Sequence, residues 1–115
     1  MIENFENRKK IYIAAPYTSA PVDNTRRVME VADKVLEMGY LPYLPHLSLL
    51  WDLHSPKSYS FWLNYHIEWL KDCDALLRLD GESVGANKEI RVAEKFGLPL
   101  FYSLEELSLW NTKKI

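Results

Sequence analysis

Apolar and polar residues follow two alternating patterns along this chain. Short apolar runs predict buried strands at 10–15, 41–44, 74–79 and 98–102. Between these runs, apolar residues recur every three or four positions and predict helices at about 24–38, 59–72, 86–96 and 104–110. Strands that alternate with helices form parallel sheets through right-handed crossovers. We therefore predict one doubly wound, flavodoxin- or Rossmann-like α/β domain over residues 1–115, with its core at about 10–107, a parallel sheet of four to five strands and helices on both faces.

Local signals refine three of these segments. Asp23 or Asn24 is suited to cap the first helix, because either side chain can accept backbone N–H groups. Pro42 and Pro45 lack the N–H donor that an interior strand needs, so the second strand is expected at an edge of the sheet. The run 46–56 fits neither pattern, and we expect a loop with at most one helical turn there.

The predicted helix at 59–72 is unusually apolar. Its large apolar residues cover most of its circumference: Phe61, Trp62, Leu63, Tyr65, Ile67, Trp69 and Leu70. One sheet contact needs only one apolar stripe on a helix. The surplus favours a partner subunit on this helix, and we expect a homo-oligomer.

Composition narrows the class of protein. The chain has 115 residues, 48% of them hydrophobic, and a formal net charge of −2, so nothing in its electrostatics favours nucleic acid or an anionic membrane as a partner. No apolar run reaches the length of a membrane span, and the first residues lack the pattern of a signal peptide. Cys73 is the single cysteine, which excludes an internal disulfide. A cytoplasmic protein is the simplest expectation.

Three connecting segments are predicted to meet at one edge of the sheet. Segments 15–21, 45–54 and 80–85 each follow the carboxyl end of a strand, where open α/β sheets bind ligands. None contains the glycine-rich dinucleotide pattern or the lysine-bearing phosphate loop. We therefore expect no nicotinamide or flavin cofactor and no NTPase activity.

The strand-to-helix turn at 80–89 holds the strongest candidate chemistry. Ser83, with the backbone N–H groups of Gly85 and Ala86 at the start of the helix, is suited to bind a phosphate or a polar sugar group. Glu89, expected in the first turn, is suited to attack an electrophilic carbon. On local grounds a structural interpretation stays open, in which Ser83 only caps the helix and Glu89 only favours the positive end of its dipole.

Three phrases of the sequence resemble a known superfamily. S-V-G-A-N-K-E, the preceding W-L-K-D-C-D-A-L-L-R-L and the early K-I-Y-I-A-A-P-Y-T resemble the nucleoside 2-deoxyribosyltransferase superfamily, which includes deoxynucleoside 5′-monophosphate N-hydrolases. The resemblance covers about residues 10–107 and is greatest to short relatives of these enzymes. It implies a doubly wound α/β sheet and a reaction that breaks an N-glycosidic bond.

The resemblance also implies roles for single residues. The family glutamate falls on Glu89, which would attack the anomeric carbon and form a glycosyl ester. The family tyrosine falls on Tyr12, which would hydrogen-bond and orient this nucleophile. The serine of the motif falls on Ser83, which binds the 5′-phosphate in the monophosphate hydrolases.

One position departs from the family pattern. The family commonly has an aspartate where this chain has His66, a residue that could hydrogen-bond or protonate the leaving base near neutral pH. Tyr17 is a candidate sugar contact or a packed loop residue, and His46 is expected to line the pocket. Together with Asp52 and His54, His46 could alternatively bind a metal, but the spacing fits no established zinc motif, and we expect no metal.

Two functions remain open from the sequence. The first is an enzyme that cleaves or transfers at the N-glycosidic bond of a nucleoside or nucleotide through Glu89, with water or a second base as acceptor. The second is a non-catalytic module that binds a nucleotide or nucleoside derivative. Thr18 stands where family nucleotide hydrolases often have arginine, which weakens the case for a phosphorylated substrate.

Overall fold

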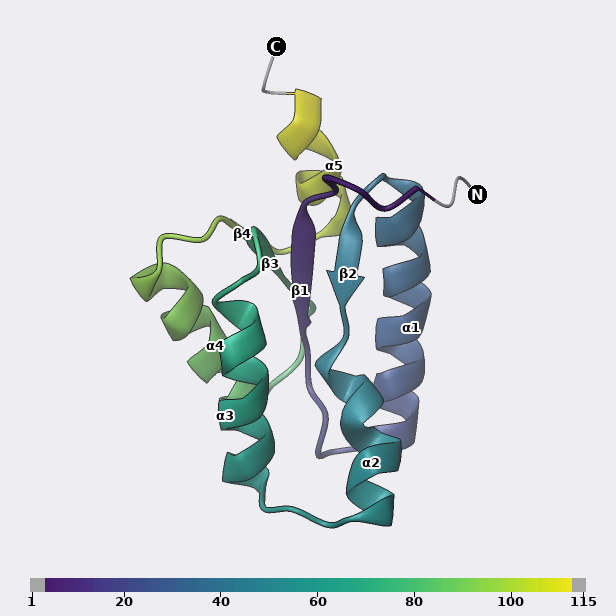
Figure 1. Ribbon diagram of the computed structural model, residues 1–115, viewed down its shortest axis with the longest axis vertical. Helices are drawn as coiled ribbons and strands as arrows, with labels where there is room; N and C mark the ends of the chain where they lie inside the picture. The colour runs from purple at the N-terminus through teal and green to yellow at the C-terminus, as the bar shows by residue number, and fades with distance from the viewer. Residues whose placement is uncertain (1–3, 113–115) are drawn as a thin grey trace.

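Parallel strands form the centre of the molecule (Figure 1). The computed structural model describes residues 4–112, and the side chains of residues 4–110. The outermost residues of the predicted domain, 1–3 and 113–115, lie outside the described residues. The sheet has the order β2-β1-β3-β4, with strands β1 (Lys10–Ala14), β2 (Leu41–Tyr43), β3 (Ala75–Arg78) and β4 (Leu100–Phe101). All three pairings are parallel, so the predicted α/β class and the strand number are confirmed.

Helices cover both faces of this sheet, as predicted. In chain order they are α1 (Pro21–Glu37), the 3₁₀ helix η1 (Pro45–Ser48), α2 (Leu49–His54), α3 (Tyr59–Leu70), α4 (Val84–Lys95) and α5 (Leu104–Thr112). Successive side chains of a strand point to opposite faces. Ile11 and Ile13 accordingly pack in one core cluster with α1 and α5, whereas Tyr12 and Ala14 pack in the other with α3 and α4. The edge position expected for the proline-containing strand is confirmed, because β2 pairs only with β1.

The predicted cap of α1 was wrong. The helix begins at Pro21, ahead of Asp23 and Asn24, because proline at the first helical position has no N–H to satisfy and a backbone angle already suited to the helix. Asn24 instead donates its side-chain amide to Tyr17 O at 3.1 Å and to Ser19 Oγ at 3.2 Å. This side chain therefore fixes the loop that leaves β1.

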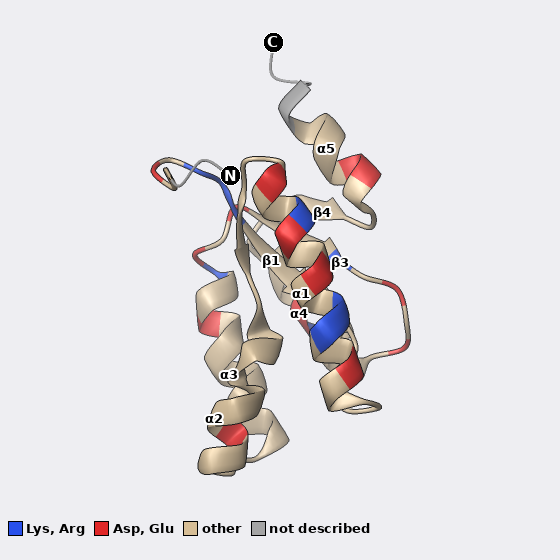
Figure 2. Cartoon of the chain, turned by 90° about the vertical axis from the view of Figure 1, so that its right-hand side faces the viewer, with Lys and Arg blue, Asp and Glu red and all other residues tan. Residues whose placement is uncertain are grey.

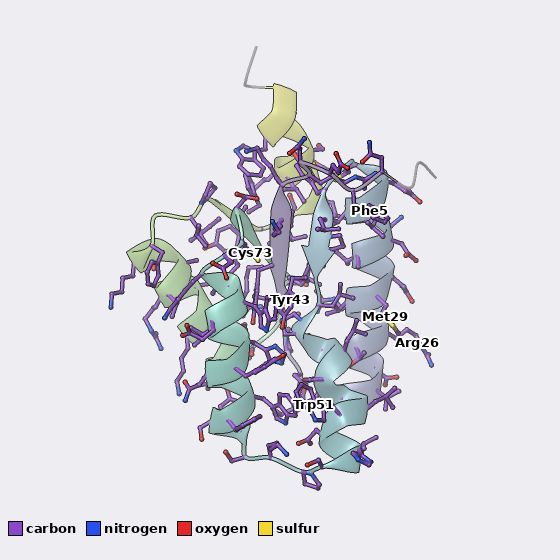
Figure 3. The ribbon with its side chains drawn as sticks, in the orientation of Figure 1. Phe5, Arg26, Met29, Tyr43, Trp51 and Cys73 are labelled. Atoms are coloured by element: carbon purple, nitrogen blue, oxygen red, sulfur yellow. The ribbon has the colours of Figure 1, made fainter. Side chains whose placement is uncertain are left out.

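The expected loop at 46–56 is largely helical. Residues 45–54 form η1 and α2, and α2 has no fully buried residue, which explains why its sequence shows no clear apolar stripe. Tertiary contacts hold it instead: Asp52 Oδ1 accepts hydrogen bonds from Lys57 N at 2.9 Å and Trp62 Nε1 at 2.7 Å. The ring of Trp51 also packs against Trp62, and Figure 3 shows Trp51 between α2 and α3.

Helix α3 leaves much apolar surface uncovered. Tyr59, Phe61 and Trp69 are 49%, 41% and 48% exposed. Figure 2 shows few charged residues on α2 and α3. Among the described residues, no helix is long and apolar enough to cross a membrane.

Candidate active site

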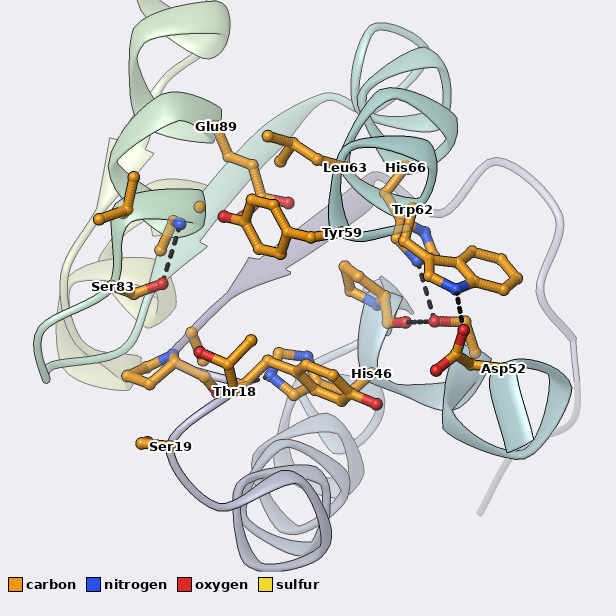
Figure 4. A pocket seen from close by; sticks show the side chains of 18 of the residues that line it. Thr18, Ser19, His46, Asp52, Tyr59, Trp62, Leu63, His66, Ser83 and Glu89 are labelled. Carbon is orange, nitrogen blue, oxygen red and sulfur yellow. Dashed lines mark hydrogen bonds between the residues drawn. The ribbon is translucent and has the colours of Figure 1, made fainter. Parts of the chain in front are cut away.

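A pocket of about 770 Å³ opens at the carboxyl ends of the strands (Figure 4). Residues after β1, β2 and β3 line it together with the start of α3, so the three predicted segments do meet at one edge. Seven of the eight predicted site residues line it: Tyr17, His46, His66, Ser83, Gly85, Ala86 and Glu89. A volume of this size is typical of sites for small organic ligands.

Glu89, which lines this pocket, is hydrogen-bonded to Tyr12 in the adjoining core. Glu89 is 7% exposed and lies in the second turn of α4, not in the first as expected, because the helix already begins at Val84. The Tyr12 hydroxyl, fully buried in β1, donates a hydrogen bond to Glu89 Oε2. The sequence separates these residues by 77 positions, and the alternation of β1 together with the crossover after β3 brings them together.

Burial sets the ionisation of this pair. Loss of solvent raises the pKa of Glu89 to about 7, although the Tyr12 hydrogen bond and the charge of Arg78 act in the opposite direction. Burial and the nearby Glu89 raise the pKa of Tyr12 well above its ordinary value. Tyr12 therefore remains a proton donor at neutral pH, while Glu89 is divided between its neutral and charged forms.

Ser83 caps the helix that carries Glu89. Its Oγ accepts the Ala86 N–H at 3.0 Å, so the capping interpretation of this serine is confirmed. Because Ser83 also lines the pocket, its own hydroxyl proton remains suited to a ligand. The two interpretations of Ser83 are therefore compatible.

Two arginines hold the turn that leads into α4. Arg78 is buried and donates to Leu79 O and to Gly81 O, the latter at 2.7 Å. Arg27 of α1 pairs with Asp80 at the surface. Sequence reasoning missed both contacts, although an arginine inside a predicted buried strand is a signal that it must find partners.

His66 is buried in the wall, with both ring nitrogens in hydrogen-bond contact. Nδ1 lies 2.9 Å from Tyr43 Oη and Nε2 lies 3.1 Å from Ser48 Oγ. Ser48 Oγ donates its proton to Pro45 O at 2.9 Å, so the Ser48 oxygen accepts from His66 Nε2–H and Nδ1 accepts from Tyr43. Burial lowers the pKa of His66 to about 4, which keeps the ring neutral. In this arrangement neither nitrogen is directed at a ligand.

His46 supports the opposite wall. Its Nε2 lies 2.8 Å from Pro16 O and must donate to it, because a carbonyl oxygen only accepts. Its ring meets the edge of Tyr17 at a centroid distance of 5.4 Å, so Tyr17 is packed and also faces the pocket. Within the described part of the chain, no group of three or more His, Cys, Asp or Glu is placed to hold a metal ion.

The start of α3 supplies wall residues that the sequence analysis left out. Tyr59, Trp62 and Leu63 line the pocket from this helix. Ser58 Oγ accepts Phe61 N–H at 3.1 Å and caps α3, which starts the helix beside the pocket. The Ser58 cap was a usable local signal, whereas the contact of Tyr59 with the start of α4 depends on the tertiary fold.

These features define a doubly wound α/β protein with a buried carboxylate at the edge where such folds bind ligands. Residues 9–103 match a family described as "Domain of unknown function (DUF7768)". The match covers most of the chain, which belongs to this family. A comparison with curated proteins found no match.

Solved structures with this fold include two deoxyribosyltransferases. A 2-deoxyribosyltransferase from Leishmania mexicana has a TM-score of 0.62 and 20% identity over 80% of this chain and 61% of that one. A 2-deoxyribosyltransferase from the psychrotolerant bacterium Bacillus psychrosaccharolyticus has a TM-score of 0.58 and 18% identity over 79% and 69%. The chain thus spans less than two thirds of the Leishmania enzyme. The predicted structural similarity to the superfamily is confirmed at the level of the fold.

Proposed function

We propose that this protein cleaves or transfers at the N-glycosidic bond of a nucleoside or nucleotide, with Glu89 as nucleophile. The observation that carries the proposal is the buried Glu89 carboxyl, which accepts a hydrogen bond from Tyr12 and lines a pocket of about 770 Å³. The fold shared with proteins described as 2-deoxyribosyltransferases supports it.

The proposed reaction has two steps. Glu89 Oε1, the oxygen not bonded to Tyr12, attacks the anomeric carbon, and the bond from that carbon to the base nitrogen breaks. The electron pair leaves with the base, which takes up a proton. Water or a second base then attacks the same carbon, breaks the glycosyl ester and gives up a proton. A carboxylate beside the sugar both stabilises the oxocarbenium-like transition state and forms the ester.

A non-catalytic binding module is the second candidate, and His66 favours it. Both nitrogens of this residue are bonded within the protein, and its ring is neutral, so it offers no proton to a leaving base in this arrangement. To protonate the leaving base, His66 would have to break its hydrogen bond to Ser48 and bond to the substrate instead. Replacement by aspartate tests whether this position limits catalysis.

Base release from a panel of substrates tests the reaction. Deoxynucleosides, ribonucleosides and their monophosphates are incubated with and without acceptor bases, and free or exchanged base is measured by chromatography. We expect release that Glu89→Gln abolishes and that Glu94→Gln, an exposed carboxylate of the same helix, leaves intact. A 2′-fluoro substrate slows the second step, and mass spectrometry should then find the sugar on the peptide that contains Glu89. Full activity of Glu89→Gln would exclude Glu89 as the nucleophile. Ligand binding without base release by the wild type would favour the binding module.

We also propose that α3 joins two copies of this chain. Its exposed aromatic residues motivate this, and multi-angle light scattering tests it. Phe61→Glu should convert the oligomer to a monomer, whereas Phe5→Glu, at a similarly exposed phenylalanine outside α3, should not. A wild-type monomer at working concentration would contradict the proposal.

A further inference from the structure

The Tyr59 phenol packs against the start of α4, beside Glu89. The first N–H groups of a helix have no intrahelical partner and commonly bind phosphate. Here Tyr59 reaches across from α3, and a Cβ added to Gly85 would lie 2.5 Å from Tyr59 Oη and 3.5 Å from its Cζ. Figure 4 shows the Tyr59 ring between α3 and the start of α4, beside the Glu89 side chain. The Tyr59 hydroxyl therefore lies against the first turn of α4, inside the pocket that a phosphate would have to enter.

The charges in the pocket also disfavour an anion. Asp52, Glu82 and Glu89 line it, and among its described lining residues Lys57 is the one fixed positive charge. The Lys57 ammonium is already engaged, because it donates to Ser55 Oγ at 2.5 Å and lies 5.6 Å from the centre of the Phe61 ring. Glu82 precedes the cap residue Ser83 directly, so among the described lining residues a phosphate at the start of α4 would meet a carboxylate and no unengaged cation.

We propose that the pocket takes an unphosphorylated nucleoside, and that Tyr59 and Glu82 are the residues that reject a 5′-phosphate. This inference rests on the proposed function, because it names the substrate class of the same site. Burial and the charge of Glu89 raise the pKa of Tyr59, so its phenol stays protonated. It can then donate a hydrogen bond to a neutral sugar hydroxyl. Glu82 is exposed, so solvent screens its repulsion of a phosphate, which corresponds to roughly threefold discrimination.

A matched pair of ligands tests the inference. A deoxynucleoside and its 5′-monophosphate are compared by kcat/KM for base release, and independently by Kd from calorimetric titration. The wild type should prefer the nucleoside by roughly tenfold in both measurements. Glu82→Gln and Tyr59→Ala should each narrow this ratio about threefold, whereas Glu94→Gln should leave it unchanged. Both replaced side chains are exposed or half-exposed, and thermal unfolding verifies that each variant is folded.

The outcomes separate this inference from the proposed reaction. Monophosphate that binds or reacts as well as the nucleoside overturns the inference and leaves the reaction standing. A ratio that neither variant changes overturns the assignment to Tyr59 and Glu82. Preferential nucleoside binding without any release supports the inference and overturns the reaction, and the absence of binding by either ligand overturns both.

Discussion

Replacing Glu89 by glutamine is expected to stabilise the protein above pH 7. Burial raises the pKa of this carboxyl from its ordinary value of 4.5 to about 7, so the folded state holds the proton more tightly than the unfolded state does. The stability of the wild type should therefore fall as the pH rises from about 4.5 to about 7 and then level off. The gap between the two pKa values corresponds to about 3 kcal/mol of unfolding free energy.

Glutamine removes this dependence because it carries no charge. Its oxygen can still accept the Tyr12 hydroxyl, but its buried amide N–H groups need partners, at about 1 kcal/mol. Glu89→Gln should therefore be about 2 kcal/mol more stable than the wild type at pH 8 and about 1 kcal/mol less stable at pH 4.5.

Urea unfolding followed by tryptophan fluorescence between pH 4.5 and pH 8.5 measures this difference directly. Glu94→Gln is the control, because its carboxylate lies exposed on the same helix, and its difference from the wild type should not vary across this range. If the difference in unfolding free energy between Glu89→Gln and the wild type stays constant with pH, the raised pKa of the Glu89 carboxyl is refuted.

Two further changes test the surroundings of this carboxyl. Tyr12→Phe removes a hydrogen bond to the charged form of Glu89, so the acid limb of the kcat/KM profile should move up by about 1 to 2 pH units, with activity at pH 7 reduced about 5- to 50-fold; an unmoved limb would contradict the orienting role. Gly81→Ala should destabilise by about 2 to 4 kcal/mol in urea unfolding, because φ is +115° there and the new Cβ would lie 2.8 Å from Pro16 Cγ. Gly39→Ala, with φ +94° and no neighbour within 4 Å, should cost only about 1 kcal/mol, and equal losses at the two glycines would exclude the contact with Pro16 as the cause.

The sheet could be predicted because its information is local. The strand β1 is apolar at every position after Lys10, which indicates burial on both faces, and it lies in the sheet interior. Pro42 carried an equally local signal for the edge position of β2. The prediction for segment 46–56 failed because contacts with other segments hold its helices: His46 of η1 donates to Pro16 O, and Asp52 of α2 accepts from Trp62 Nε1. The spacing of apolar residues contains no trace of these contacts.

The two sides of the candidate site differ in the same way. Tyr12 and Glu89 lie on neighbouring elements whose faces follow from strand alternation and a right-handed crossover, so their meeting was open to prediction once the family resemblance named them. His66 bonds to Tyr43 of β2 and Ser48 of η1, and Tyr59 of α3 meets Gly85 of α4. The spacing of apolar residues records none of these contacts. Sequence therefore specified the carboxyl that would react, while the contacts that would select its substrate became visible only in three dimensions.

The expected stability gain of Glu89→Gln also bears on function. A carboxyl whose ionisation costs about 3 kcal/mol in the folded state is an expensive way to fill a core position that a neutral side chain would fill better. Structural carboxylates are ordinarily exposed or paired with a cation, whereas Glu89 is 7% exposed and its hydrogen-bond partner is the neutral Tyr12. A residue that weakens the fold at neutral pH and faces a pocket has the physical profile of a group kept for its chemistry. If the pH-dependent gain is measured and base release is lost in the same variant, the two results together would separate Glu89 from every structural explanation of its place in α4.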